Sequence, residues 1–191
     1  MQADFAVELA VDDETLEIPW AAPAGGPSYR DLKRHPELLP QVEEAKREEA
    51  LAEFLAAMNA RGSIFETAKC DSWASTDIAP EEEIYGASWK FASYVDLLFE
   101  DARRYSFAAH QSLAAAVTGL LKRTPEIPAA AEFLIRRCYF HEGSQAREGF
   151  YVTCYSLGYG ENEEQAHQQW VIGLKLAENA LRQISKTNLE A

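Results

Sequence analysis

Arg136 and Arg137 open the chemically densest stretch of this sequence, which ends with His141 and Glu142. Consecutive residues of a strand point to opposite faces, so one arginine must lie on the buried side of a sheet or at its rim. A buried guanidinium needs an anionic neighbour, because an unpaired charge is costly away from water. We expect an internal ion pair, with Glu66 or Glu132 as the partner. The alternative is an anion site in which the planar guanidinium binds the carboxylate or phosphate of a ligand.

Two histidines are candidate proton-transfer groups if the protein is an enzyme. His141 ends the arginine-containing segment beside Glu142, and His110 lies on the apolar stripe of a predicted helix. General acid–base catalysis requires the donor within hydrogen-bond reach of the reacting group. Adjacent residues rarely converge on one point, and a histidine on an apolar stripe more often fills core space. We therefore interpret His110 as a core residue and keep His141 as a candidate ligand-binding residue.

The dipeptide Lys69-Cys70 is a further candidate. A neighbouring ammonium lowers the pKa of a thiol, and the resulting thiolate is a nucleophile. Because neighbours in a strand face opposite ways, Lys69 does not automatically touch Cys70. We interpret Cys70 as a small core residue and keep Lys69 as a candidate ligand-binding residue.

Sequence motifs for cofactor and metal chemistry are missing. The chain has no glycine–lysine phosphate loop, no HExxH and no GxSxG. Its three cysteines, Cys70, Cys138 and Cys154, lack zinc-site spacing. Gly158-Tyr159-Gly160 supplies two of the three glycines of a dinucleotide-binding motif, and we interpret it as a turn. We expect no cofactor and no metal, and no catalytic residue can be named.

Alternating apolar residues predict four strands in the later part of the chain. A helix follows each pair of strands. The first covers about 101–123, and the second begins at Asn162, where Gln165 completes a capping box. The predicted strands are Ile64–Trp73, Ala87–Val95, Glu132–His141 and Phe150–Leu157.

The order strand–strand–helix therefore occurs twice, over about 63–124 and 131–187, which indicates an internal duplication. Aligning the two units without a gap in their helices places Phe107 on Trp170. Two such units most simply form a four-stranded antiparallel sheet with both helices on one face. The predicted fold class is α+β, with an N-terminal hairpin and helix added to the duplicated unit.

The two sides of the strands differ in composition. In the last strand, the side with Val152 meets the helices, and the opposite side carries Tyr151 and Tyr155. The equivalent strand of the first unit presents Lys90 and Tyr94 on the same outer face. This face is covered by the N-terminal segment, forms a subunit interface, or lines a ligand site. Tyr151 and Lys90 therefore join the candidate ligand-binding residues.

The first 27 residues are expected to form an arm and linker, followed by a single domain over 28–191. Alternation over 5–11 and 16–20 predicts a hairpin, and the proline- and glycine-rich run after it predicts the linker. The apolar spacing further along predicts a helix over about 40–60.

Asp and Glu outnumber Lys and Arg by 31 to 18, which gives a formal net charge of -13. Nucleic acids and anionic membranes attract clustered basic residues, so neither is expected as a partner. The acidic start of the chain is unlike a secretory signal, and no apolar stretch approaches the ~20 residues of a membrane span. Three cysteines without a signal peptide indicate reduced thiols and a cytoplasmic location.

These features favour a cytoplasmic binding or protein-interaction domain that forms a homo-oligomer. One alternative is an enzyme acting on a small anionic metabolite, with Arg136 or Arg137 as the anion site and His141 or His110 as the acid/base. Another is an acidic protein that neutralises a basic protein partner. The lack of a catalytic motif favours the first hypothesis, although many catalytic sites are assembled from distant residues.

Overall fold

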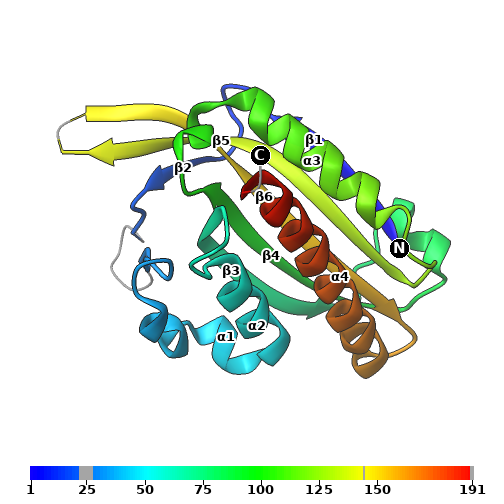
Figure 1. Cartoon of the computed structure of the whole chain (residues 1–191). Coiled ribbons are helices and arrows are strands. Elements are labelled where there is room, and N and C mark those ends of the chain that lie inside the picture. The colour runs from blue at the N-terminus through cyan, green and yellow to red at the C-terminus, as the bar shows by residue number, and fades with distance from the viewer. Residues whose placement is uncertain (22–27, 144, 190–191) are drawn as a thin grey trace.

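One mixed sheet runs through the molecule, with its strands in the order β1-β5-β6-β4-β3 and with β2 beside β5 (Figure 1). The computed structural model describes residues 1–21, 28–143 and 145–189. The strands are β1 (Gln2–Glu8), β2 (Thr15–Ile18), β3 (Phe65–Ser75), β4 (Trp89–Phe99), β5 (Ala129–Glu142) and β6 (Gln145–Gly160). The α+β class predicted from the sequence is confirmed.

The N-terminal strands do not form the predicted hairpin. Both β1 and β2 pair in parallel with β5, so that Glu8 lies opposite Arg136 and Thr15 lies opposite Arg137. Alternation identifies a strand but not its partner, and β5 is long enough to hold both strands end to end. The sheet is therefore six-stranded and mixed rather than four-stranded and antiparallel. The predicted linker falls partly on residues 22–27, which lie outside the described residues.

Helices cover one face of the sheet. Figure 1 shows α4 (Glu163–Leu189) between α2 (Glu49–Met58) and α3 (Phe107–Leu121). The order β3-β4-α3 followed by β5-β6-α4 reproduces the predicted succession of two strands and a helix, twice. The helix predicted over about 40–60 is divided, because Glu48 adopts an extended conformation between α1 (Glu43–Arg47) and α2. No helix of the described chain is both long and apolar enough to span a membrane.

Close packing of α4 on the sheet depends on Gly158. A Cβ atom at this glycine would lie 2.0 Å from the backbone nitrogen of Trp170. Trp170 is fully buried, and its Nε1 donates a hydrogen bond to Ser93 Oγ at 2.9 Å. Gly158 therefore lies within β6 as a helix contact and not in the turn expected from the sequence. Burial of an aromatic residue of this size contributes roughly 2–3 kcal/mol.

Two segments cover the ends of the opposite, outer face of the sheet. At one end Leu16 and Ile18 of β2 pack on a second small core that includes Tyr151. At the other end the 3-10 helix η2 (Pro80–Tyr85) lies on β6, where the rings of Tyr85 and Tyr159 stack with centroids 4.1 Å apart. Among the described elements, no helix or strand covers the strip of sheet between them.

Candidate functional site

The strand register places five outer-face residues in one row across the uncovered strip. The row runs from Asp4 on β1 through Glu132 on β5, Tyr155 on β6 and Tyr94 on β4 to Asp71 on β3. The tyrosine ring centroids are 5.9 Å apart. Two adjacent aromatic rings are thus bordered by carboxylates on both sides. We call these five residues the acidic tyrosine row.

Trp73 extends the aromatic surface. It lies one row further along β3, opposite Ala92, and its ring centroid is 6.4 Å from that of Tyr94. The residue is 39% exposed, and few large hydrophobic residues in the described part of the chain are so accessible. An exposed tryptophan beside two half-buried tyrosines is typical of a surface that binds another molecule.

The three carboxylates of the acidic tyrosine row are balanced unequally, since Lys122 lies 4.0 Å from Asp4, with both side chains exposed. Glu132 has no ion-pair or hydrogen-bond partner within the described parts of the chain. Partial burial, followed by the charges of Glu8 and Asp4, raises the pKa of Glu132 above its usual value. Asp71 is paired with Arg47 at 3.5 Å, and both side chains are more than half exposed. A cation placed over the tyrosines would relieve this repulsion and would also interact with the ring faces.

A buried polar cluster lies in the next row of the same face. Asp96 is 3% exposed, and Thr153 Oγ1 donates a hydrogen bond to Asp96 Oδ1 at 2.7 Å. Arg136 in turn donates from an Nη atom to Thr153 Oγ1 at 3.2 Å. Burial raises the pKa of Asp96 to about 7, despite the opposing hydrogen bond from Thr153. This carboxyl group can therefore gain or lose a proton near neutral pH.

Arg136 is held by carboxylates of the N-terminal segment. Its Nε donates to Glu8 at 2.7 Å, and an Nη atom lies 3.4 Å from Glu14. The internal ion pair expected for an arginine of this segment is therefore present. Its partners are not Glu66 or Glu132, because β1 lies along β5 and brings Glu8 opposite Arg136.

Tyr151 and Lys69 lie around the same cluster. Tyr151 is fully buried opposite Arg136, and its hydroxyl has no hydrogen-bond partner among the described residues. The Lys69 ammonium lies 3.9 Å from Glu14 and 5.4 Å from the ring centroid of Trp20. Three of the six ligand-binding candidates, Arg136, Tyr151 and Lys69, therefore come together beside the acidic tyrosine row.

The other three candidates lie apart from this cluster. Arg137 donates to the backbone carbonyl of Leu9 at 3.2 Å, and its Nε lies 3.6 Å from Glu148. His141 contacts Glu17 where both side chains are exposed. Lys90 binds Glu82 of η2 at 2.8 Å.

The histidine and cysteine considered for catalysis lie on the helix side of the sheet. His110 is buried against Phe99, and burial lowers its pKa. Burial also raises the pKa of Cys70 to about 12, with Glu44 as the next largest influence. A thiol with this pKa is protonated at neutral pH and is a poor nucleophile. Among the described residues, no three His, Cys, Asp or Glu side chains are grouped as a metal site would require.

Comparisons with protein-family models, with curated proteins and with solved structures found no match to this chain.

The sequence analysis did not identify Asp96, and it did not predict that Asp4 and Tyr155 lie beside Glu132 in the sheet. Asp96 follows directly after the predicted strand 87–95, within the apolar run that ends at Phe99. An acidic residue inside such a run is a usable signal, because a charge there must be neutralised or paired. The acidic tyrosine row itself depends on which strands are neighbours, and no local pattern contains that information.

Proposed function

We propose that this protein is a protein-interaction domain that binds a basic segment of a partner protein on the acidic tyrosine row. The observation that carries the proposal is the row itself, with Tyr155 and Tyr94 between Glu132 and Asp71 on an uncovered strip of sheet. Lysine and arginine side chains interact favourably with both groups. Each cation–π contact contributes roughly 0.5–1 kcal/mol at such a surface, and carboxylates add charge complementarity.

The basic residues of the outer face are already engaged, which supports a cationic rather than an anionic ligand. Arg136 is paired with Glu8 and Glu14, and Lys90 is paired with Glu82. An anionic metabolite would have to displace these carboxylates. The net charge of -13 would also attract a basic partner from a distance and speed up its association.

The proposal is tested by isothermal titration with an acetylated and amidated decapeptide of alternating lysine and valine. The variants Glu132→Gln and Trp73→Ala each remove one component of the surface. Controls on α4 are Glu164→Gln and Ile172→Ala, since α4 lies on the other face of the sheet and Ile172 is 46% exposed.

We expect the peptide to bind the wild-type protein and to bind more weakly as salt increases. Glu132→Gln and Trp73→Ala should each weaken binding about three- to tenfold, which corresponds to a loss of one charge contact or one aromatic contact. The control variants should bind within about twofold of wild type. Equal affinity of all five proteins would contradict the proposal.

A further inference from the structure

The outer edge of β3 is a sheet edge with two different halves. β3 is the last strand of the sheet and pairs only with β4 on one side. A free edge exposes backbone N–H and C=O groups that can pair with another extended chain. Proteins usually block such an edge, so a part of the edge that is not blocked is a candidate site for pairing with another strand.

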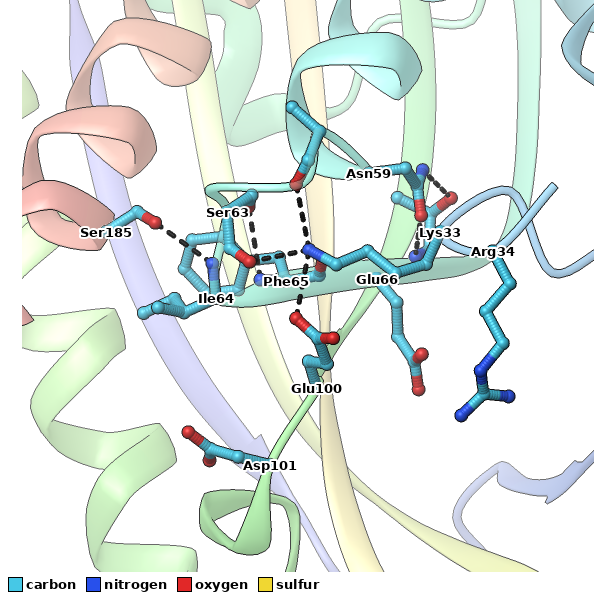
Figure 2. Close-up of polar contacts among 12 residues, drawn as sticks. Lys33, Arg34, Asn59, Ser63, Ile64, Phe65, Glu66, Glu100, Asp101 and Ser185 are labelled. Atoms are coloured by element: carbon cyan, nitrogen blue, oxygen red, sulfur yellow. Dashed lines mark hydrogen bonds and ion pairs between the residues drawn. The ribbon is translucent and has the colours of Figure 1, made fainter. Parts of the chain in front are cut away.

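Side chains from other elements block the first half of this edge (Figure 2). The Lys33 ammonium donates to the carbonyls of Ser63 at 2.5 Å and Phe65 at 3.0 Å. The Asn59 side chain accepts from the Thr67 backbone N–H at 3.1 Å. Trp20 Nε1 donates to the carbonyl of Ala68 at 3.0 Å. From Phe65 to Ala68, the edge is therefore occupied by this chain.

The second half of the edge runs from Cys70 to Ser75, where Trp73 and Ala74 are exposed and Ser72 is only 6% exposed. Ser72 donates its backbone N–H to the neighbouring Asp71 carboxylate at 2.7 Å. This bond indicates that the backbone N–H of Ser72 points away from β4. Backbone groups alternate between the two sides of an antiparallel strand, so Cys70 and Ala74 face the same way as Ser72. No side chain of another described element reaches these edge groups through a hydrogen bond.

A groove lies where the two halves of the edge meet. It has a volume of about 610 Å³ and passes between β3 and the segment that leads into α1. Val42, Leu55 and Cys70 give it an apolar side, and Tyr94 of the acidic tyrosine row lines it as well. The volume lies within the range of about 300–1,000 Å³ that is usual for ligand pockets.

We infer that the basic segment binds as an additional strand on the β3 edge from Cys70 to Ser75. In an added strand, successive side chains point to opposite faces of the sheet. One set would lie on the outer face beside Trp73 and Asp71, and the other set would point to the groove side. The segment would therefore alternate basic and apolar residues. The basic character of the segment rests on the proposed function, whereas pairing at the edge rests on the second half of the β3 edge.

Strand addition is tested with two peptides that share the same side chains. The first is the lysine–valine decapeptide, and the second carries methyl groups on its six central backbone nitrogens. Methylation removes the donors of a β-ladder while it keeps charge and side chains. The variant Ala74→Pro removes one edge N–H of the protein without touching the ladder to β4, and proline is tolerated at such edge positions.

We expect the unmethylated peptide to bind at least about tenfold more tightly, since several ladder hydrogen bonds are lost on methylation. Ala74→Pro should remove this difference, whereas Trp73→Ala should weaken both peptides equally. As a second measurement, the amides of Cys70 and Ala74 should exchange hydrogen more slowly when the unmethylated peptide is bound. This readout uses the wild-type protein and does not depend on the folding of a variant.

Several results would overturn the inference. If both peptides bind equally to wild type and to Ala74→Pro, strand addition is wrong while the proposed function stands. If neither peptide binds, both are wrong. If the free protein is a dimer that Ala74→Pro converts to a monomer, a second copy of this chain occupies the edge instead of a partner peptide.

Discussion

Asp96 and Thr153 lie directly opposite each other on β4 and β6, and the threonine hydroxyl donates to the buried carboxyl group at 2.7 Å. This pair lies one row from Tyr94 and Tyr155 on the same face. It therefore places a carboxyl group with a pKa near 7 beside the proposed binding surface. The position of this acid has consequences for stability that can be measured without any ligand.

Asp96→Asn should stabilise the protein at high pH. The pKa of Asp96 is raised from 3.8 in the unfolded chain to about 7 in the folded state, so the folded state holds a proton that the unfolded state releases. The stability supplied by the neutral carboxyl group is complete below about pH 4 and is lost as the pH rises through 7. The advantage of the variant should grow by about 2 kcal/mol between pH 5.5 and pH 8.5.

Urea unfolding of wild type and Asp96→Asn at both pH values measures this difference. Asn keeps an oxygen that accepts the bond from Thr153, so the packing of the site is retained. Asp12→Asn is a suitable control, because Asp12 is exposed. If the free energies of unfolding of wild type and Asp96→Asn change in parallel with pH, Asp96 is not a buried acid with a raised pKa.

Gly158→Ala should strongly destabilise the protein, because the new Cβ would lie 2.0 Å from Trp170 N and 2.4 Å from Ala166 O. Both atoms belong to the backbone of α4, so relief requires the helix to move away from the sheet. We expect a loss of roughly 3 kcal/mol or more in thermal or urea unfolding. Gly119→Ala is the control within a helix, where no atom beyond the adjoining residues and the helix's own backbone lies within 4 Å of the added methyl group. It should be stabilised by about 0.5–1 kcal/mol, and equal behaviour of the two variants would contradict the close helix contact.

Lys33→Met should lower stability by roughly 1–3 kcal/mol. The ammonium of Lys33 satisfies the backbone carbonyls of Ala60, Ser63 and Phe65 and lies 3.1 Å from Glu100 (Figure 2). Its side chain is only 6% exposed, so methionine would leave these carbonyls without their donor. Lys46→Met is the matched control, because Lys46 makes an exposed pair within one helix turn. A loss no larger than that of the control would show that Lys33 does not anchor this segment.

The three thiols should react slowly in the folded protein. Burial raises the pKa of Cys70, Cys138 and Cys154 to about 12, so almost no thiolate is present at pH 8. Labelling with a disulfide reagent at pH 8 should therefore be slow in buffer and fast for all three thiols in denaturant. Rapid reaction of one thiol in the folded state would reopen the nucleophile hypothesis for Cys70, which is the least buried of the three.

The sequence predicted which face of a strand each residue lies on better than it predicted which strands are neighbours in the sheet. Alternation in β6 correctly separated Val152 from Tyr155, because the two-residue period is a local property of a strand. The predicted ion-pair partners of Arg136, Glu66 and Glu132, were wrong because β1 was expected to form a hairpin and instead pairs with β5. Pairing between segments more than 120 residues apart depends on the whole topology, and that pairing is what placed Glu8 beside Arg136.

The binding surface was predictable only in part for the same reason. Tyr155 and Tyr94 were expected on one outer face, and the register confirms that they are direct neighbours. The flanking carboxylates of Glu132 and Asp71 come from β5 and β3, on either side of the two central strands. Their positions follow from strand order, which hydrophobic periodicity does not encode.

The most direct measurement of the binding claim is a titration of the ¹⁵N-labelled protein with the lysine–valine decapeptide, followed through the tryptophan indole N–H signals. Trp73 lies on the proposed surface, whereas Trp170 is buried on the helix side with its N–H bonded to Ser93. We predict that the Trp73 signal shifts in proportion to bound peptide while the Trp170 signal stays in place. Binding with no change at Trp73 would show that the basic segment binds elsewhere and would contradict the proposed binding surface.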